Sequence, residues 1–236
     1  CGGGTIADKH DLSTGSVGPP VRCCEILLRE WKEAGYSPLN ENPQGEVLIG
    51  GGNVALGYFK NPEKTAEEFV TVNGKRYFAT GDIGEFRSDG SLKIIDRKKD
   101  LLKLAHGEYI SLGKVETTLL TCPLVDNICA YGDSQRDFLV ALVVPNQKAV
   151  TELAEKIGAD EKEWEDICES PAVTQAVLQE LVSYIGNKLI RVEVPQKIYL
   201  CHEAWTPQSG LLTEALKLKR KSIENAFRTE LDQMYR

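Results

Sequence analysis

Three separate segments combine residue types that could bind a nucleotide and act on a phosphate group. In residues 77–82 (YFATGD), the carboxylate of Asp82 follows a glycine and could accept hydrogen bonds from both hydroxyls of a ribose. In residues 96–101 (DRKKDL), Arg97 offers a planar fork of donors that suits ribose oxygens or phosphate. Each segment alone has an ordinary alternative, which is an Asp-containing turn for the first and a solvated charged run for the second.

The third segment, residues 205–220 (WTPQSGLLTEALKLKR), places lysines after a turn rich in threonine and glycine and just before an expected helix. A lysine there could reach an ATP phosphate and a carboxylate together, and it would stabilise negative charge that develops in a transition state. The alternative is the basic start of an amphipathic helix. Between the second and third segments, Gly107 would let a backbone edge approach a narrow ligand without a side chain in the way.

Short strands separated by turns would position the first segment, which is expected to close its strand and enter a turn. In residues 61–69, a proline at the first helical position and early acidic residues predict a short helix. Alternating patterns and turn signals such as Asn73-Gly74 predict strands at 21–28, 45–49, 77–78 and 92–95.

Past Arg97 the pattern changes to a mixture of strands and helices, so we place a domain boundary and linker there. The apolar, β-branched run at 138–144 predicts a buried strand. The other strands are expected at 101–104, 108–110, 127–131 and 197–200. Helices are expected at 112–120, Gln147–Ile157, 172–189 and 214–234. The predicted fold class is therefore α+β.

The composition limits the classes of function. The net charge of −7 argues against a nucleic-acid binder, because no basic face stands out from the acidic background. Seven cysteines without a CxxC pair and three scattered histidines suggest neither a metal site nor a disulfide framework. We expect a reducing, intracellular compartment, and the apolar runs fall short of the ~20 residues needed to cross a bilayer. The opening CGGG lacks a methionine, which we interpret as the start of a fragment.

In this order and at these spacings, the three segments resemble the acyl-adenylate-forming superfamily, which includes acyl-CoA synthetases, luciferase and peptide-synthetase adenylation domains. Residues 45–69 (GEVLIGGGNVALGYFKNPEKTAEEF) carry the same resemblance. Further stretches are similar to the eukaryotic long-chain acyl-CoA synthetases, namely 96–116 (DRKKDLLKLAHGEYISLGKVE), 143–147 (VVPNQ), 164–168 (WEDIC) and 216–223 (LKLKRKSI).

The resemblance implies a division of the chain into three parts. Residues 1–97 would be the end of the large N-terminal AMP-binding domain, with short strands that form a small β subdomain. Residues 98–100 would be a hinge, and 101–236 would be the small mobile α+β C-terminal domain. The hinge position would be Lys99, where the backbone rotates between two half-reactions.

The resemblance also implies roles for individual residues. Asp82 would bind the ribose hydroxyls, and Arg97 and Tyr77 would also contact the nucleotide. Gly107 and Glu108 would line the channel for coenzyme A. Lys217 best matches the catalytic lysine of adenylation.

The lysine assignment has an alternative. The family often shows Thr-Pro-Thr before the catalytic lysine, whereas here Glu214 and Ala215 follow Thr213, so Lys219 competes with Lys217.

The implied substrates are a long-chain fatty acid, ATP with Mg²⁺, and coenzyme A. The phosphate-binding loop, a Thr-Glu pair for Mg²⁺ and the acyl tunnel lie upstream in the family, so we expect the fragment alone to be inactive. The parent protein would associate with a membrane through a missing N-terminal segment, at the endoplasmic reticulum, mitochondrial outer membrane or lipid droplet.

Two other functions stay open. One is a ligase for another carboxylate, such as a short-chain, aryl or amino acid. Residues 151–192 argue against it, because they look like the insertion typical of the long-chain group. The other is a non-catalytic binding or regulatory module, although the joint presence of Asp82, Arg97 and Lys217 counts against a degenerate copy. The basic run at 217–221 could also touch anionic lipid.

Overall fold

The computed structural model describes residues 3–10 and 14–236, and the chain divides into two compact units, Cys1–Leu101 and Leu102–Arg236. The predicted first domain begins at Cys1, which lies outside the described residues. The units meet in sequence between Leu101 and Leu102, close to the predicted 98–100 linker. The expected α+β fold class is confirmed. The roles of large domain, hinge and mobile domain stay predictions.

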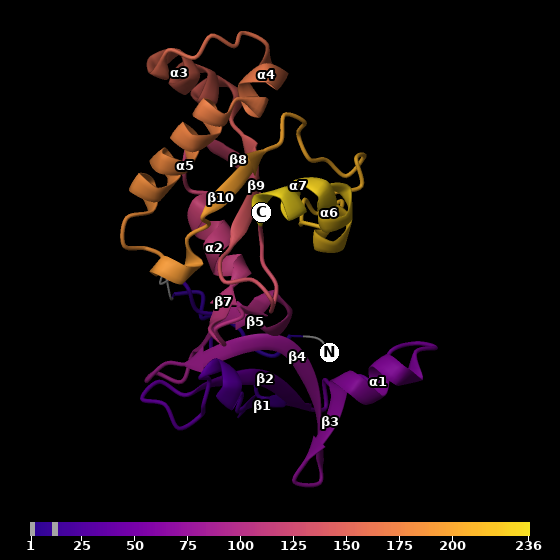
Figure 1. Ribbon diagram of the computed structural model, residues 1–236. Helices are drawn as coiled ribbons and strands as arrows, with labels where there is room; N and C mark the ends of the chain where they lie inside the picture. The colour runs from indigo at the N-terminus through magenta and orange to yellow at the C-terminus, as the bar shows by residue number, and fades with distance from the viewer. Residues whose placement is uncertain (1–2, 11–13) are drawn as a thin grey trace. The chain divides into compact units, whose positions relative to one another are not determined.

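The first unit is built on one five-stranded antiparallel sheet (Figure 1). The strand order is β1-β2-β4-β3, and β5 pairs with the second half of β4. The strands are β1 (Cys24–Arg29), β2 (Gln44–Gly51), β3 (Phe69–Val72), β4 (Lys75–Phe86) and β5 (Leu92–Arg97). The short helical elements are α1 (Pro62–Glu68), η1 (Lys32–Ala34) and η2 (Lys98–Asp100).

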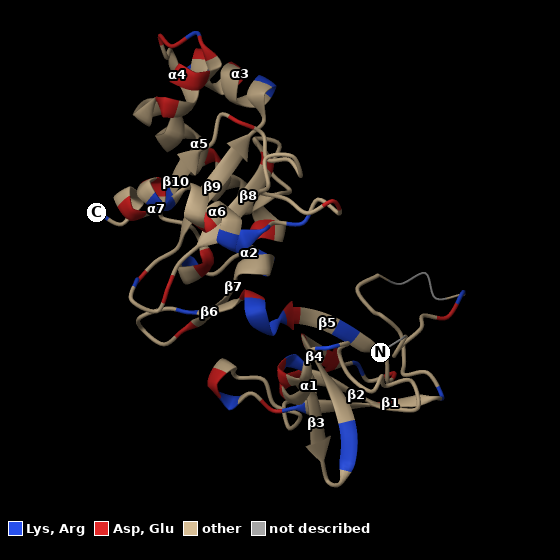
Figure 2. Ribbon diagram, turned by 90° about the vertical axis from the view of Figure 1, so that its right-hand side faces the viewer, with Lys and Arg blue, Asp and Glu red and all other residues tan. Residues whose placement is uncertain are grey.

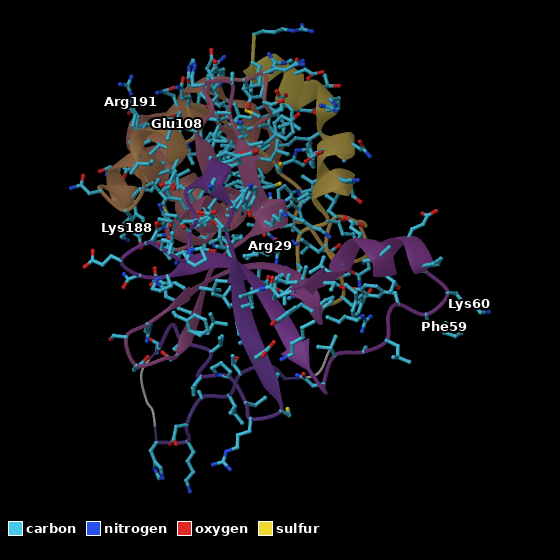
Figure 3. The ribbon with its side chains drawn as sticks, turned by 90° about the horizontal axis from the view of Figure 1, so that it is seen from below. Arg29, Phe59, Lys60, Glu108, Lys188 and Arg191 are labelled. Carbon is cyan, nitrogen blue, oxygen red and sulfur yellow. The ribbon has the colours of Figure 1, made fainter. Side chains whose placement is uncertain are left out.

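Helix α1 forms where the sequence predicted it. The side chain of Asn61 caps the helix by accepting a 3.0 Å hydrogen bond from the Lys64 amide, and Pro62 occupies the first turn. Just before α1, the side chains of Phe59 and Lys60 point away from the sheet (Figure 3).

The prediction that residues 77–82 close a strand and enter a turn was wrong. Strand β4 continues to Phe86, because β2 and β5 supply backbone hydrogen bonds on its two edges. The irregularity is a β-bulge, in which Thr80, Gly81 and Asp82 of β4 lie opposite the single residue Val47 of β2. Gly81 permits the bulge with a φ of 74°, a left-handed value that few other residues adopt.

The second unit centres on a three-stranded sheet of order β10-β9-β8, with β10 parallel and β8 antiparallel to β9. A separate two-stranded ribbon pairs β6 with β7. The strands are β6 (Leu101–Lys103), β7 (Tyr109–Ser111), β8 (Val125–Tyr131), β9 (Val140–Pro145) and β10 (Lys197–Leu200). The helices are α2 (Leu112–Leu119), α3 (Gln147–Ile157), α4 (Trp164–Glu169), α5 (Pro171–Ile185), η3 (Arg191–Glu193), α6 (Arg220–Ala226) and α7 (Arg228–Met234).

Strand β9 is buried along its whole length and carries no charged residue, as the apolar run predicted (Figure 2). Its side chains alternate between two cores. Ala141 and Val143 pack with helices α2 to α5, whereas Val140, Leu142 and Val144 pack with α6, α7 and the segment before them. The sheet of this unit is therefore covered on both faces (Figure 1).

One helix prediction in the second unit needs correction, and one helix was missed. The expected single helix at 214–234 is broken into α6 and α7 at Phe227, whose ring packs against Trp205 and Tyr199. The segment before Arg220 is a loop rather than a helix. Helix α4 was not predicted at all. In the part of the chain that the structure describes, we find no helix of the length and apolar character that a bilayer crossing needs.

Candidate functional site

The first unit brings together two of the predicted nucleotide ligands. Asp82 and Arg97 face each other across the β4–β5 pair, and Arg97 Nε donates a 2.9 Å hydrogen bond to Asp82 Oδ1. This bond raises the pKa of the Arg97 guanidinium further above its ordinary value. The bulge places the Asp82 side chain beside Arg97, where it is 29% exposed. A carboxylate of this kind, fixed by one cation, can still accept bonds from ligand hydroxyls.

The structure does not bring Tyr77 to this pair. Its ring is buried in an apolar cluster with Leu48 and Ala79, directly over Gly50, where even a Cβ would approach the ring to 2.7 Å. Its hydroxyl donates a short hydrogen bond to the Glu25 carboxylate, and this bond raises the pKa of Tyr77. The position of Tyr77 is that of a core residue, which the motif alone did not reveal.

A cavity of about 540 Å³ in the first unit adjoins the bulge and includes Thr80, Gly81 and Arg97 in its wall. Its other charged wall residues include four basic and three acidic side chains, which are Arg29, Lys64, Lys98, Lys99, Glu46, Glu67 and Glu68. The aromatic rings of Tyr58 and Phe78 also line it. Aromatic faces beside clustered cations suit a nucleotide, because they offer stacking and phosphate attraction together.

The predicted hinge residue Lys99 lies in the 3₁₀ turn η2, next to an anchored neighbour. Lys98 Nζ lies 3.3 Å from the buried Glu46 carboxylate and 5.2 Å from the centre of the Trp31 ring. Arg29 also donates a 2.7 Å bond to the same carboxylate. Lys99 itself forms no ion pair with the residues that the structure describes. Sequence reasoning missed this Glu46 cluster.

In the second unit, Gly107 and Glu108 lie in the turn between β6 and β7. The Gly107 amide donates a 2.8 Å bond to Leu104, and the Leu104 amide donates a 2.9 Å bond to Glu108. Gly107 has a φ of 88°, and both residues are exposed. The turn is thus an exposed hairpin tip, and the role of these two residues beside coenzyme A stays a prediction.

Lys217 and Lys219 lie on an exposed loop of the second unit. The loop folds back on itself, since Leu212 and Leu218 form an antiparallel bridge and the Lys219 amide bonds to Leu211 at 2.9 Å. Leu212 and Leu218 pack toward the core, so the alternating lysines point to solvent. Either lysine could therefore present a free ammonium group.

An ion pair with a buried carboxylate lies beside this loop, and it was not predicted. Glu116 is 6% exposed, and its carboxylate receives two 2.7 Å bonds from the Arg220 guanidinium. The sequence held a signal for it, because the helical spacing places Glu116 on the same buried face of α2 as Leu112, Val115 and Leu119. A carboxylate on the buried face of a helix needs a partner.

Among the described residues, no group of three or more His, Cys, Asp or Glu side chains could hold a metal ion.

Residues 114–210 match the family described as the AMP-binding enzyme C-terminal domain. This stretch of the chain is similar to the C-terminal domain of the AMP-binding enzymes. It is 45% identical to long chain acyl-CoA synthetase 8 of Arabidopsis thaliana, an alignment that covers 100% of this chain and 33% of that protein. It is also 39% identical to long-chain-fatty-acid–CoA ligase 1 of Saccharomyces cerevisiae, over 100% of this chain and 34% of the relative. The chain thus spans about a third of the length of these relatives, and the resemblance inferred from the motifs is confirmed.

Solved structures of adenylation domains share the fold. The adenylation domain of a carboxylate reductase from Mycobacterium chelonae is 32% identical, with a TM-score of 0.74 over 94% of this chain and 32% of that one. The corresponding domain from Segniliparus rugosus, solved with AMP and a co-purified carboxylic acid, is 31% identical with a TM-score of 0.73 over 93% of this chain and 32% of that one.

Proposed function

We propose that this chain is the C-terminal part of a long-chain fatty acid–CoA ligase that works through an acyl-adenylate. The observation that carries the proposal is the 45% identity to a long chain acyl-CoA synthetase along the whole of this chain. The presence of Asp82, Arg97 and Lys217 in one chain supports an active enzyme rather than a module without chemistry.

In the first half-reaction, a carboxylate oxygen of the fatty acid attacks the α-phosphorus of ATP, and the bond to pyrophosphate breaks. Asp82 accepts hydrogen bonds from the ribose hydroxyls, while Arg97 holds the Asp82 carboxylate in place and adds donors of its own. Lys217 supplies positive charge to the phosphate oxygens as negative charge spreads over them.

In the second half-reaction, the thiolate of coenzyme A attacks the carbonyl carbon of acyl-AMP, and the bond to AMP breaks. The backbone turns at Lys99, so that Lys217 withdraws and the Gly107–Glu108 hairpin tip borders the path of coenzyme A. The support for Lys99 as the pivot is its place in the short turn η2, close to the boundary between the two units, because hinges are formed by a few residues in loops or at the ends of elements.

The experiment that tests this function measures both half-reactions in the full-length protein that contains this sequence. We expect ATP–pyrophosphate exchange that depends on palmitate or arachidonate, and release of acyl-CoA when coenzyme A is added. The function proposed here fails if no fatty acid supports exchange. Because the phosphate loop and acyl tunnel are expected upstream, we propose that this chain alone is inactive.

The likeness to adenylation domains of carboxylate reductases favours, as a second candidate, an AMP-forming ligase for a different carboxylate. The same assay with acetate, benzoate and amino acids separates the two candidates. Exchange with one of these acids and none with palmitate would favour the second.

We propose further that the full-length protein is peripheral to, or anchored on, an intracellular membrane through a segment outside this chain. Its sites would be the endoplasmic reticulum, mitochondrial outer membrane or lipid droplet. The support is the chemistry of the proposed substrate, which partitions into bilayers. Fractionation of cells that express the full-length protein tests this, and recovery in the soluble fraction alone would contradict it.

A further inference from the structure

The buried Glu116 and the partly buried Arg220 form an ion pair in the second unit. Glu116 Oε1 accepts from Arg220 Nη1 and Oε2 accepts from Nη2, each at 2.7 Å, and Oε1 also accepts a 2.8 Å bond from the Ala130 amide of β8. The guanidinium contacts the Ala130 carbonyl as well, at 3.4 Å. The pair thus ties helix α2, strand β8 and the first residue of α6 together.

Such a pair fixes geometry more than it adds stability. Burying two charges costs desolvation that their attraction only offsets, and replacing a whole buried pair with apolar side chains is often neutral. What the pair contributes is geometric specificity, because a planar guanidinium that makes two parallel hydrogen bonds to a carboxylate fixes the orientation of both groups.

Arg220 lies three residues after Lys217, at the end of the loop that presents this lysine. On its other side the loop is held by the Leu212–Leu218 bridge and by two bonds between Thr213 and Lys217, of 2.8 and 3.1 Å. The side chain of Lys217 has no hydrogen bond or ion pair to the described residues. Its position is therefore set by the backbone, and the backbone is fixed at Arg220.

We propose that the Glu116–Arg220 pair is a positioning device, which holds the loop at residues 211–219 so that Lys217 presents its ammonium group at one place during adenylation. The proposal rests on the proposed function. A donor to a developing charge must be fixed closely in position, since a displacement of about 1 Å can cost on the order of 10²-fold in rate. Glu116 and Arg220 act through Lys217 and touch no substrate themselves.

The second unit offers a matched control. Glu193 is also 6% exposed, and its carboxylate receives two 2.7 Å bonds from Lys114 and a 3.0 Å bond from the Ile190 amide. It lies in η3, after the exposed residues Lys188 and Arg191 (Figure 3), and it has no bond to the 211–219 loop. Glu193→Gln therefore disturbs an equally buried carboxylate without disturbing the loop.

The test uses the full-length protein as wild type, Glu116→Gln, Arg220→Lys and Glu193→Gln. Amide hydrogen exchange at residues 211–219 is measured first, because it does not depend on catalysis. Each variant is then assayed for ATP–pyrophosphate exchange and for thioester formation from preformed acyl-AMP. Arg220→Lys keeps the charge but loses the fork, so it serves if Glu116→Gln fails to fold.

In Glu116→Gln and Arg220→Lys, we expect the amides of residues 211–219 to exchange at least tenfold faster than in wild type, to order of magnitude. We expect the kcat of adenylation to fall by roughly tenfold or more in both variants, while the rate of thioester formation stays unchanged. Glu193→Gln should change neither the exchange of the loop amides, nor the kcat of adenylation, nor the rate of thioester formation. Unchanged loop amides in Glu116→Gln and Arg220→Lys, or an equal loss of adenylation in Glu193→Gln, would overturn the proposal. If wild type lacks adenylation activity, the proposed function fails, while the amide measurement still decides whether the pair fixes the loop.

Discussion

Arg97 lies directly opposite Asp82 across two paired strands, and a 2.9 Å hydrogen bond from Nε to Oδ1 joins them. The two motifs that were 15 residues apart in sequence are therefore one structural unit. The bulge at Gly81 and the register of β5 against β4 create the arrangement, which leaves the outer nitrogens of Arg97 for a ligand.

Asp82→Asn is expected to weaken nucleotide binding. A hydrogen bond to a charged group contributes about 1.5–3 kcal/mol, which corresponds to a rise of roughly 10- to 100-fold in the KM for ATP in pyrophosphate exchange. Asp89→Asn, an exposed turn residue of the same unit, is the control and should leave this KM unchanged. An unaltered KM in Asp82→Asn would remove Asp82 from the nucleotide site.

Lys217→Ala is expected to lose adenylation by roughly 10²–10³-fold, as for removal of one transition-state donor, and to keep thioester formation from preformed acyl-AMP. Lys219 lies in the same loop as Lys217 and is also exposed, so Lys219→Ala shows whether an alanine in this loop affects the enzyme by disturbing the loop structure. It should stay near wild type in both assays. The opposite pattern would transfer the catalytic role to Lys219.

Tyr77→Phe is expected to leave the KM for ATP unchanged, because the Tyr77 hydroxyl bonds to Glu25 inside the first unit. Loss of that bond should lower the melting temperature instead. A raised KM without a change in melting temperature would restore Tyr77 to the nucleotide site.

Gly50→Ala is expected to destabilise the first unit by about 1–3 kcal/mol, because the new Cβ would meet the Tyr77 ring at 2.7 Å. Gly52→Ala is the matched substitution, since a Cβ at that position has no heavy atom within 4 Å. Its effect should stay within about 0.5 kcal/mol. Denaturant unfolding of the full-length protein compares the two, and equal midpoints would contradict the packing argument.

The thiols predict a pH dependence. Burial raises the pKa of Cys129 to about 12 and that of Cys168 to about 11, from an ordinary value of 9.0. Because the folded-state values are the higher ones, the unfolded chain releases these protons first as pH rises above 9. The free energy of unfolding should therefore be unaffected by these thiols below pH 9 and fall as pH rises toward 11–12.

Alkylation with iodoacetamide, mapped by mass spectrometry, checks the same environments. The exposed Cys23 should react in the folded protein, whereas Cys129 and Cys168 should react only after unfolding. Rapid labelling of Cys129 at neutral pH would contradict its burial.

The sequence by itself determined the elements whose signals are local. Helix α3 was predicted at its observed bounds, Gln147–Ile157. Its limits are local in sequence, because Asn146 caps its start and Gly158 follows its last residue. Strand β9 followed from its apolar run, and the order of the motifs gave the family. Each of these signals lies within a few consecutive residues.

The tertiary structure alone decided the features that depend on distant partners. Strand β4 passes through the TGD motif because β2 and β5 pair with it. In the tail, α6 begins at Arg220, which bonds to a carboxylate 104 residues away, and the helix breaks at Phe227, whose ring packs against Tyr199 and Trp205. The burial of Tyr77 depends on Gly50 of another strand. Long-range hydrogen bonds and packing override local propensity, and the sequence carries no nearby signal of which partners will meet.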